Sequence, residues 1–313
     1  MKKLYVASPR GFCAGVRRAL ETVGKACSQW SGTVYILHEI VHNEFVVEKL
    51  RRHGVIMVED IREVPEESLV IFSAHGVSPQ VEEEAARRRL KVIDATCPLV
   101  EKIHRKAAEL SHCGYRVFLI GHRNHPEIQG TLGRLKMPAT VIETTADVAT
   151  AAATMSIPEK TAFLTQTTLS TTDTAHIAAE LERCFPGIKG ETDICYATAN
   201  RQNAVRQLAG CCDTIFIVGS PKSSNSNRLR ETAVQEGVRA FLVRTADDVT
   251  PDMLDHAQCI GISAGASAPE TLVMALCRYL CRAGWQPPET LVCVEEKINF
   301  SLPEWSFQRG RER

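Results

Sequence analysis

The chain has 313 residues, in which 37 lysine and arginine residues balance 37 aspartate and glutamate residues. This length favours two or three domains with a substantial hydrophobic core. The even charge balance gives no global basic field for nucleic acid and no acidic excess typical of disorder. The apolar runs are only strand-length and the N-terminus lacks the apolar region of a signal peptide. We therefore expect a cytoplasmic protein with no nucleic-acid or membrane partner.

Short β-branched runs alternate with helix-like stretches along the chain, a pattern that predicts an α/β protein with parallel sheets. In chain order the expected strands read "LYVAS", "VYILH", "LVIFSAH", "KVIDATC", "RVFLIGH", "TIFIVGS", "AFLVR" and "QCIGISAG". The helix-like stretches include "QVEEEAARRRL" and "LVEKIHRKAAEL". Ligands of such sheets bind beyond the carboxyl ends of the strands.

Three cysteines recur in similar surroundings, each at the expected start of a helix. They lie in "RGFCAGVRRAL" (Cys13), "DATCPLVEKIH" (Cys97) and "DICYATANRQNAV" (Cys195). A strand that ends in a polar cluster follows each cysteine by 28 or 29 residues, and these clusters read "LHEIVHNE", "IGHRNHPE" and "VGSPKSSNSN". A second strand of each repeat also ends in a polar cluster, in "FSAHGVSP", "LTQTTLST" and "ISAGASAP". The recurrence indicates an internal threefold repeat.

The repeat predicts three α/β units, at residues 1–97, 98–194 and 195–283. The tail, residues 284–313, contains a strand-like run that we expect to complete the sheet of the first unit. Three similar units around one axis are the simplest arrangement. Such a pseudo-threefold trefoil would bring the three cysteines together at its centre.

The three repeated cysteines are candidate metal ligands. The start of a helix favours a thiolate, because the backbone N–H groups and the helix dipole stabilise negative charge. The chain contains no C-x-x-C pair, so its pattern differs from zinc ribbons and ferredoxin-type runs. An iron-sulfur cluster held by three cysteines leaves one iron open as a Lewis acid that also passes electrons. We expect the other cysteines to be packing residues: Cys27, Cys113, Cys184, Cys211, Cys212, Cys259, Cys277, Cys281 and Cys293.

The polar clusters supply donors of the kind that bind phosphate. These donors are His42, His75, His125, Ser223, Ser224, Asn225 and Ser267. Glu127 lies two residues after His125 and is the candidate proton donor. Each residue taken alone also has an ordinary explanation, because "SSNSN" is a suitable helix cap and a lone histidine is more often structural. Glu127 alone fits a solvated loop glutamate, and Glu44 is similarly placed after His42.

Nine motifs in order carry a resemblance to a known family: "PRGFCAGV", "HEIVHN", "FSAHGVS", "DATCPLV", "GHRNHPE", "TQTTLS", "DICYATANRQ", "GSPKSSNSNRL" and "AGASAPE". Together they resemble 4-hydroxy-3-methylbut-2-enyl diphosphate reductase, the last enzyme of the non-mevalonate isoprenoid pathway. The resemblance spans residues 4 to about 270.

The resemblance implies a three-domain trefoil around an oxygen-sensitive [4Fe–4S] cluster held by Cys13, Cys97 and Cys195. It implies that Glu127 donates the proton and that Thr167, helped by Thr168, lies near the substrate hydroxyl. The donors named above match the positions that bind the diphosphate: His42, His75, His125, Ser223, Ser224, Asn225 and Ser267.

The reaction that the resemblance implies is the two-electron removal of the allylic hydroxyl, which gives isopentenyl and dimethylallyl diphosphate. The electrons would come from an external one-electron donor such as ferredoxin or flavodoxin. We expect a domain to close over the substrate.

Two other functions fit three repeated cysteines. One is a cluster enzyme of the quinolinate synthase or hydro-lyase type, and the other is a cluster-based sensor that binds without turnover. The phosphate-binding donors and Glu127 argue against a sensor. The nine motifs argue against the lyase.

Overall fold

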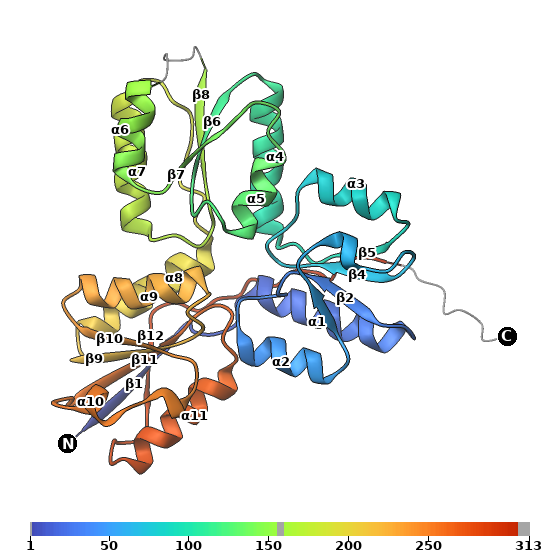
Figure 1. The fold of residues 1–313 in the computed structure, drawn as a ribbon. Helices are drawn as coiled ribbons and strands as arrows, with labels where there is room; N and C mark the ends of the chain where they lie inside the picture. The colour runs from blue at the N-terminus through green and yellow to red at the C-terminus, as the bar shows by residue number, and fades with distance from the viewer. Residues whose placement is uncertain (1, 155–159, 306–313) are drawn as a thin grey trace. The chain divides into compact units, whose positions relative to one another are not determined.

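The computed structural model describes residues 2–154 and 160–305, in which strands and helices alternate from the N-terminus to the C-terminus (Figure 1). The strands pair in parallel in three sheets within these residues. The predicted α/β class is confirmed. No helix in this part of the chain is both long and apolar enough to cross a membrane.

The strands are β1 Lys3–Ser8, β2 Val34–Leu37, β3 Ile56–Val58, β4 Leu69–Phe72, β5 Lys91–Asp94, β6 Arg116–Ile120, β7 Thr140–Ile142, β8 Thr161–Thr165, β9 Thr214–Val218, β10 Arg239–Val243, β11 Cys259–Ala264 and β12 Glu289–Val292. The α-helices are α1 Ala14–Gln29, α2 Glu44–Arg52, α3 Pro79–Arg87, α4 Pro98–His112, α5 Pro126–Leu132, α6 Thr145–Thr154, α7 Thr171–Cys184, α8 Tyr196–Ala209, α9 Ser224–Gln235, α10 Pro251–Leu254 and α11 Glu270–Arg282. Two short 3-10 helices are η1 Ile61–Glu63 and η2 Ala246–Asp248.

The described residues fall into two compact units. Unit 1 contains residues 2–16, 42–47 and 195–299, and it holds the five-stranded sheet β10-β9-β11-β1-β12. Unit 2 contains residues 17–41, 48–154, 160–194 and 300–305, and it holds the four-stranded sheet β3-β2-β4-β5 and the three-stranded sheet β7-β6-β8.

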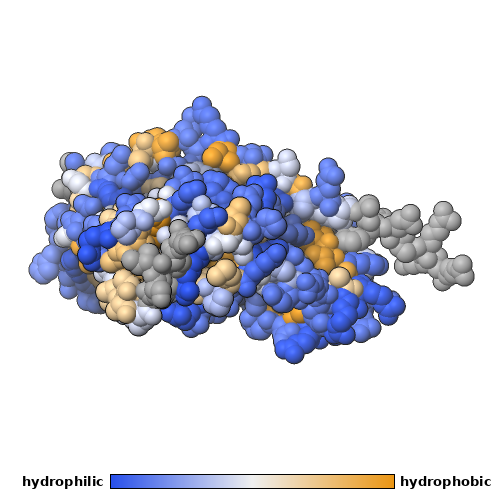
Figure 2. Space-filling model, turned by 90° about the horizontal axis from the view of Figure 1, so that it is seen from above, coloured by the Kyte–Doolittle hydropathy of each residue, from blue (hydrophilic) through white to orange (hydrophobic). Residues whose placement is uncertain are grey.

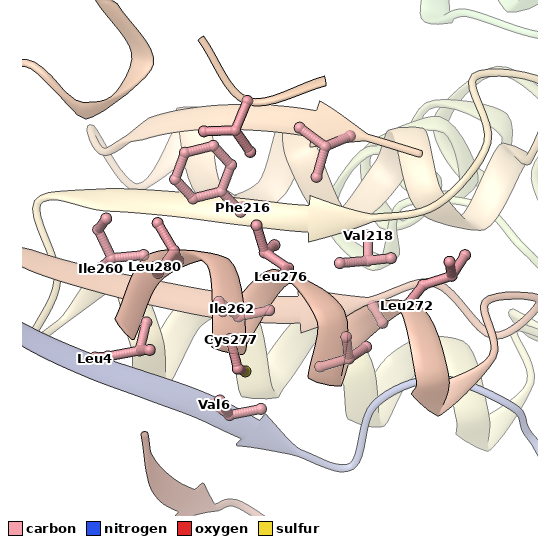
Figure 3. Packing of buried hydrophobic residues seen from close by; sticks show 14 of the residues in the cluster. Leu4, Val6, Phe216, Val218, Ile260, Ile262, Leu272, Leu276, Cys277 and Leu280 are labelled. Carbon is pink, nitrogen blue, oxygen red and sulfur yellow. The ribbon is translucent and has the colours of Figure 1, made fainter. Parts of the chain in front are cut away.

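The sheet of unit 1 is buried on both faces, because helices pack on each of them. Alternate side chains of its strands point to opposite faces. Phe216 and Val218 of β9 pack with the apolar stripe of α11, which includes Leu276 and Leu280 (Figure 3). Ile217, between the two, packs on the other face with residues of α8 and α9. The core therefore fixes the carboxyl ends of β1, β9 and β11, where ligands bind in sheets of this kind.

The two sheets of unit 2 have separate helical covers (Figure 1). In the three-stranded sheet, Phe118 and Phe163 pack with α6 and α7, while Val117 and Leu119 pack on the side of α4 and α5. In the four-stranded sheet, Phe72 packs in a cluster that includes residues of α3. Polar loops that follow the carboxyl ends of β4, β6 and β8 carry the predicted histidine and threonine clusters.

The strand β1 belongs to a different sheet from the one that we expected. We expected the tail to complete a sheet formed by residues 1–97. The tail strand β12 does pair with β1, but both belong to the sheet of β9, β10 and β11. A buried parallel strand needs a neighbour on each edge, and β11 and β12 provide them for β1. Residues 306–313 of the predicted tail lie outside the described residues.

The prediction that all nine other cysteines are packing residues is wrong for two of them. Cys113 and Cys211 are exposed, because each lies in the turn that ends a helix, after α4 and after α8. Cys212 and Cys277 are buried as expected.

Most of the surface in Figure 2 is hydrophilic, and the hydrophobic residues on that face form small separate patches.

Candidate active site

Glu127 is a buried carboxyl group at the start of a helix in unit 2. His125 is the N-cap of α5, and its Nδ1 accepts a hydrogen bond of 3.2 Å from the Glu127 N–H. The Glu127 side chain is held by Thr167, which follows β8. The Thr167 N–H donates to Oε1 at 2.7 Å, and its Oγ1 donates to Oε2 at 3.0 Å. Only 2% of Glu127 is exposed. The solvated loop glutamate is therefore excluded.

Burial raises the pKa of Glu127 to about 7, although the two hydrogen bonds from Thr167 favour the ionised form and oppose the rise. A carboxyl group with this pKa exchanges a proton readily near neutral pH. The Thr167 hydroxyl is the side-chain group through which that proton can pass, because it lies 3.0 Å from Oε2.

Cys97 and two histidines lie in the same unit as Glu127. Cys97 is the N-cap of α4, and its N–H donates to the Ala74 carbonyl at 3.0 Å, which ties it to the residue before His75. The rings of His75 and His125 meet edge to face, with centroids 5.6 Å apart. The structure therefore links His75, His125 and Glu127 through close contacts, with Cys97 joined to the His75 loop.

Gln166 organises the loops beside these residues, and it was not among the predicted site residues. Its Nε2 donates to Thr168 Oγ1 at 2.9 Å, and its Oε1 accepts from the His122 N–H at 3.0 Å. Gln166 is fully buried. Its position inside "TQTTLS" was the only signal in the sequence.

Cys13 and Cys195 belong to unit 1, and backbone N–H groups point at both sulfurs. Cys13 Sγ accepts from the Val16 N–H at 3.4 Å, and Cys195 Sγ accepts from the Thr198 N–H at the same distance. Burial, followed by the charges of Cys13, Glu296 and Cys195, raises the pKa of Tyr196 to about 12. Both sulfurs are thus within electrostatic reach of one phenol.

Three of the predicted phosphate-binding residues of unit 1, Ser223, Ser224 and Asn225, lie at the start of α9. Ser223 is the N-cap, and its Oγ accepts from the Ser226 N–H at 3.3 Å. Asn225 is only 4% exposed, and neither its amide oxygen nor its amide nitrogen has a hydrogen-bond partner in the described part of the chain. Buried polar atoms without partners are rare in proteins, and this amide is therefore suited to bind a polar ligand. Ser267 Oγ donates to the His42 carbonyl at 3.1 Å.

A cavity of about 350 Å³ lies at the carboxyl ends of β9 and β10, close to the loop that leads into α9. Asn43, Ser220 and Arg244 are among the residues that line it. The helix start comes close to the sheet here because Gly219 and Gly265 have no side chains. A Cβ atom at Gly265 would lie 2.0 Å from Ser226 Oγ.

The predicted site residues thus form two groups. Unit 1 holds Cys13, His42, Cys195, Ser223, Ser224, Asn225 and Ser267, and unit 2 holds His75, Cys97, His125, Glu127, Thr167 and Thr168. Within the described residues, no three histidine, cysteine, aspartate or glutamate side chains are grouped as a metal site. The surroundings of the three cysteines nevertheless suit thiolate ligands. All three are half-buried, and N–H groups stabilise charge on two of the sulfurs.

Comparison with known proteins gives a match over most of the chain. The family described as LytB protein matches residues 4–281. The chain belongs to the LytB family. A relative from Chromohalobacter salexigens is 47% identical over 308 residues, which cover 96% of each chain. A relative from Methylococcus capsulatus is 48% identical over 307 residues, which cover 96% of this chain and 97% of the relative. Both are named 4-hydroxy-3-methylbut-2-enyl diphosphate reductase.

Two solved structures of LytB relatives resemble the chain. The E-1-hydroxy-2-methyl-but-2-enyl-4-diphosphate reductase of Plasmodium falciparum is 36% identical with a TM-score of 0.90, and the match covers 97% of this chain and 95% of that one. An (E)-4-hydroxy-3-methyl-but-2-enyl diphosphate reductase is 33% identical with a TM-score of 0.65, covering 90% of this chain and 100% of that one. The family resemblance inferred from the nine motifs is confirmed.

Proposed function

We propose that this protein reduces (E)-4-hydroxy-3-methylbut-2-enyl diphosphate to isopentenyl and dimethylallyl diphosphate. The observation that carries the proposal is the buried Glu127 carboxyl, paired with the Thr167 hydroxyl and with a pKa near 7. Membership of the LytB family and the reductase names of its relatives support the same reaction over a lyase or a sensor. In this reaction the substrate gains two electrons and two protons and loses its hydroxyl oxygen as water.

Cys13, Cys97 and Cys195 are the proposed ligands of a [4Fe–4S] cluster. Cys13 and Cys195 belong to unit 1 and Cys97 belongs to unit 2. When bound, the cluster supplies two electrons one at a time and one iron without a cysteine ligand that acts as a Lewis acid. We infer that the electrons come from an external carrier such as ferredoxin or flavodoxin in the cytoplasm.

Glu127 and Thr167 handle the proton that leaves with the hydroxyl. With a pKa near 7, Glu127 is protonated in about half of the molecules at neutral pH. In the protonated form the Glu127 O–H donates to Thr167 Oγ1, which reverses the direction of this hydrogen bond and frees the Thr167 hydrogen. Glu127 then gives its proton to Thr167 Oγ1 as the Thr167 hydrogen moves to the departing oxygen. Burial keeps bulk water away from Glu127, so the proton is delivered at one place. Thr168, which accepts a hydrogen bond from Gln166, is assigned to help Thr167 at the substrate hydroxyl.

The diphosphate is bound by neutral donors and helix starts. Asn225 offers an unpaired amide, and the first turn of α9 contributes backbone N–H groups and a positive dipole end. Ser223, Ser224 and Ser267 add hydroxyl groups. We assign His42 and His125 to the same anion because each follows the first strand of its repeat at a matching place. His75 follows the second strand of the first repeat, and we assign it to the anion because its ring contacts that of His125.

Replacing Glu127 by glutamine tests the assignment. The full chain is reconstituted with iron and sulfide without oxygen, and turnover is followed with a chemical one-electron donor. We expect Glu127→Gln to lose turnover by about 100-fold or more while the cluster absorbance and paramagnetic signal match the unchanged protein. Glu182→Gln, an exposed glutamate of α7, is the matched control and should keep full turnover.

Two results would contradict the assignment. Unchanged turnover in Glu127→Gln would remove Glu127 from the reaction. Loss of the cluster signal in the same variant would make Glu127 a structural residue.

A further inference from the structure

Two buried arginines each bind the backbone beside a predicted cysteine ligand, and each also binds the C-terminal segment. Arg201 is 1% exposed and Arg18 is 7% exposed. Neither was among the predicted site residues, because an arginine on a helix usually lies in solvent. A buried guanidinium needs partners for all of its N–H groups, so its contacts reveal what it holds.

Arg201 lies on α8, the helix that Cys195 caps. Its Nη2 and Nε donate to the Gly11 carbonyl at 2.8 and 3.1 Å, and its Nη1 donates to the Ala197 carbonyl at 2.8 Å. Glu296 of the C-terminal segment neutralises it, with Oε1 3.0 Å from Nη1 and Oε2 3.3 Å from Nη2. The Glu296 side chain is itself 9% exposed. This buried ion pair joins the segment to α8 and to the loop before Cys13.

The loop before Cys13 has little freedom of its own. Gly11 has a φ of +61°, and a Cβ atom there would lie 3.0 Å from the Ala268 carbonyl. The Gly11 N–H donates to Ala264 and the Cys13 N–H donates to Ala266, at 3.1 and 3.3 Å. The Gly11 carbonyl points the other way, to Arg201. Arg201 therefore completes the set of contacts that place Cys13.

Arg18 makes the corresponding contacts in unit 2. Its Nη1 donates to the carbonyl of Thr96, the residue before Cys97, at 2.8 Å. Its Nε donates to the carbonyl of Ser301 at 2.8 Å. Thr96 is further held by its N–H, which donates to Asp94 Oδ1 at 2.8 Å. A second part of the C-terminal segment thus supports a second cysteine loop.

We propose that Arg201 and Arg18 are positioning residues for the cysteine loops and that the C-terminal segment, residues 296–301, completes both of them. Glu296 fixes Arg201 for Cys13 and Cys195, and Ser301 fixes Arg18 for Cys97. The inference rests on the proposed function, in which these cysteines hold the cluster. It assigns a role to a segment beyond residue 281, where the family match ends.

The first experiment measures how fast N-ethylmaleimide labels each cysteine of the full chain after the cluster is removed. In Glu296→Ala we expect Cys13 and Cys195 to react about tenfold faster, because Arg201 loses the carboxylate that fixes it. A tenfold change corresponds to about 1.4 kcal/mol of local opening free energy. Cys97 and the buried Cys277 should keep their rates. Glu295→Gln is the control, since Glu295 is exposed. Glu296→Gln keeps the side-chain length and should give a smaller change.

The second experiment shortens the chain. A chain that ends at residue 298 keeps Glu296 and loses Ser301, so Cys97 should react about tenfold faster while Cys13 does not. A chain that ends at residue 305 is the matched control. Trp305→Ala in the full chain separates the loss of Ser301 from the loss of the contact between Trp305 and Lys25.

Equal rates in all variants would overturn the proposal, and so would a parallel rise at Cys277, which would indicate general unfolding. Cluster retention gives a second readout, because a chelator should remove iron faster from Glu296→Ala than from Glu295→Gln. If the unchanged protein takes up no cluster, the proposed function fails, while the labelling rates still decide whether the arginines position the loops.

Discussion

Replacing Glu127 by glutamine should stabilise the folded protein, and the gain should grow with pH. Folding raises the pKa of Glu127 from 4.5 to about 7 because burial penalises the charged form. Below pH 4.5 the carboxyl is protonated in both states and the shift has no effect. As the pH rises, the unfolded chain loses the proton first, so the unfolded state is favoured. Glutamine is neutral at every pH and avoids this cost.

The size of the effect follows from the shift. Each pKa unit corresponds to about 1.4 kcal/mol, so the ionisation of Glu127 costs the folded state about 3 kcal/mol at pH 8 and under about 1 kcal/mol at pH 5. The glutamine side chain keeps the acceptor for the Thr167 N–H and gains a donor for Thr167 Oγ1, so its hydrogen bonds remain satisfied.

Urea unfolding of the two cluster-free proteins at pH 5 and pH 8 measures the difference. We expect the gap in unfolding free energy to widen by about 2 kcal/mol between the two pH values, in favour of glutamine. A gap that does not change with pH would refute the claim that Glu127 is held neutral by burial. A glutamine variant that is less stable at pH 8 would refute it as well.

Three further variants test particular contacts. Asn225→Ala should weaken the binding of inorganic pyrophosphate about tenfold in calorimetry, because the unpaired amide is assigned to the anion. Gly76→Ala should lower the free energy of unfolding in urea by about 1–3 kcal/mol, since its Cβ would lie 2.6 Å from the His104 ring and its φ is +76°. Gly265→Ala should cost a similar amount, and adding Ser226→Ala should recover part of it, because the close contact is with Ser226 Oγ.

The sequence predicted the class of fold because buried parallel strands are short apolar runs that stand out between amphipathic helices. It did not predict the partner of β1. The runs of β1, β4 and β9 are all short and contain apolar residues, and nothing in such a run identifies which strand lies on either edge. Connections between neighbouring strands favoured a local sheet, whereas β1 pairs with β11 from the end of the chain.

The candidate site was predicted where residues recur or match a motif. Glu127 and Asn225 were named in this way, but their burial and the unpaired amide are properties of packing that appear only in the structure. Gln166, Arg18 and Arg201 were missed because they act through buried hydrogen bonds to backbone atoms. Such contacts join residues far apart in the chain and leave no local pattern.

Product analysis with the full-length protein, reconstituted with iron and sulfide in the absence of oxygen, tests the proposed reaction most directly. A one-electron donor and (E)-4-hydroxy-3-methylbut-2-enyl diphosphate are added, and the products are identified by mass spectrometry. We expect isopentenyl and dimethylallyl diphosphate over many turnovers, and neither product from Cys195→Ser. A protein that holds the cluster and the substrate but releases neither product would contradict the proposed reaction.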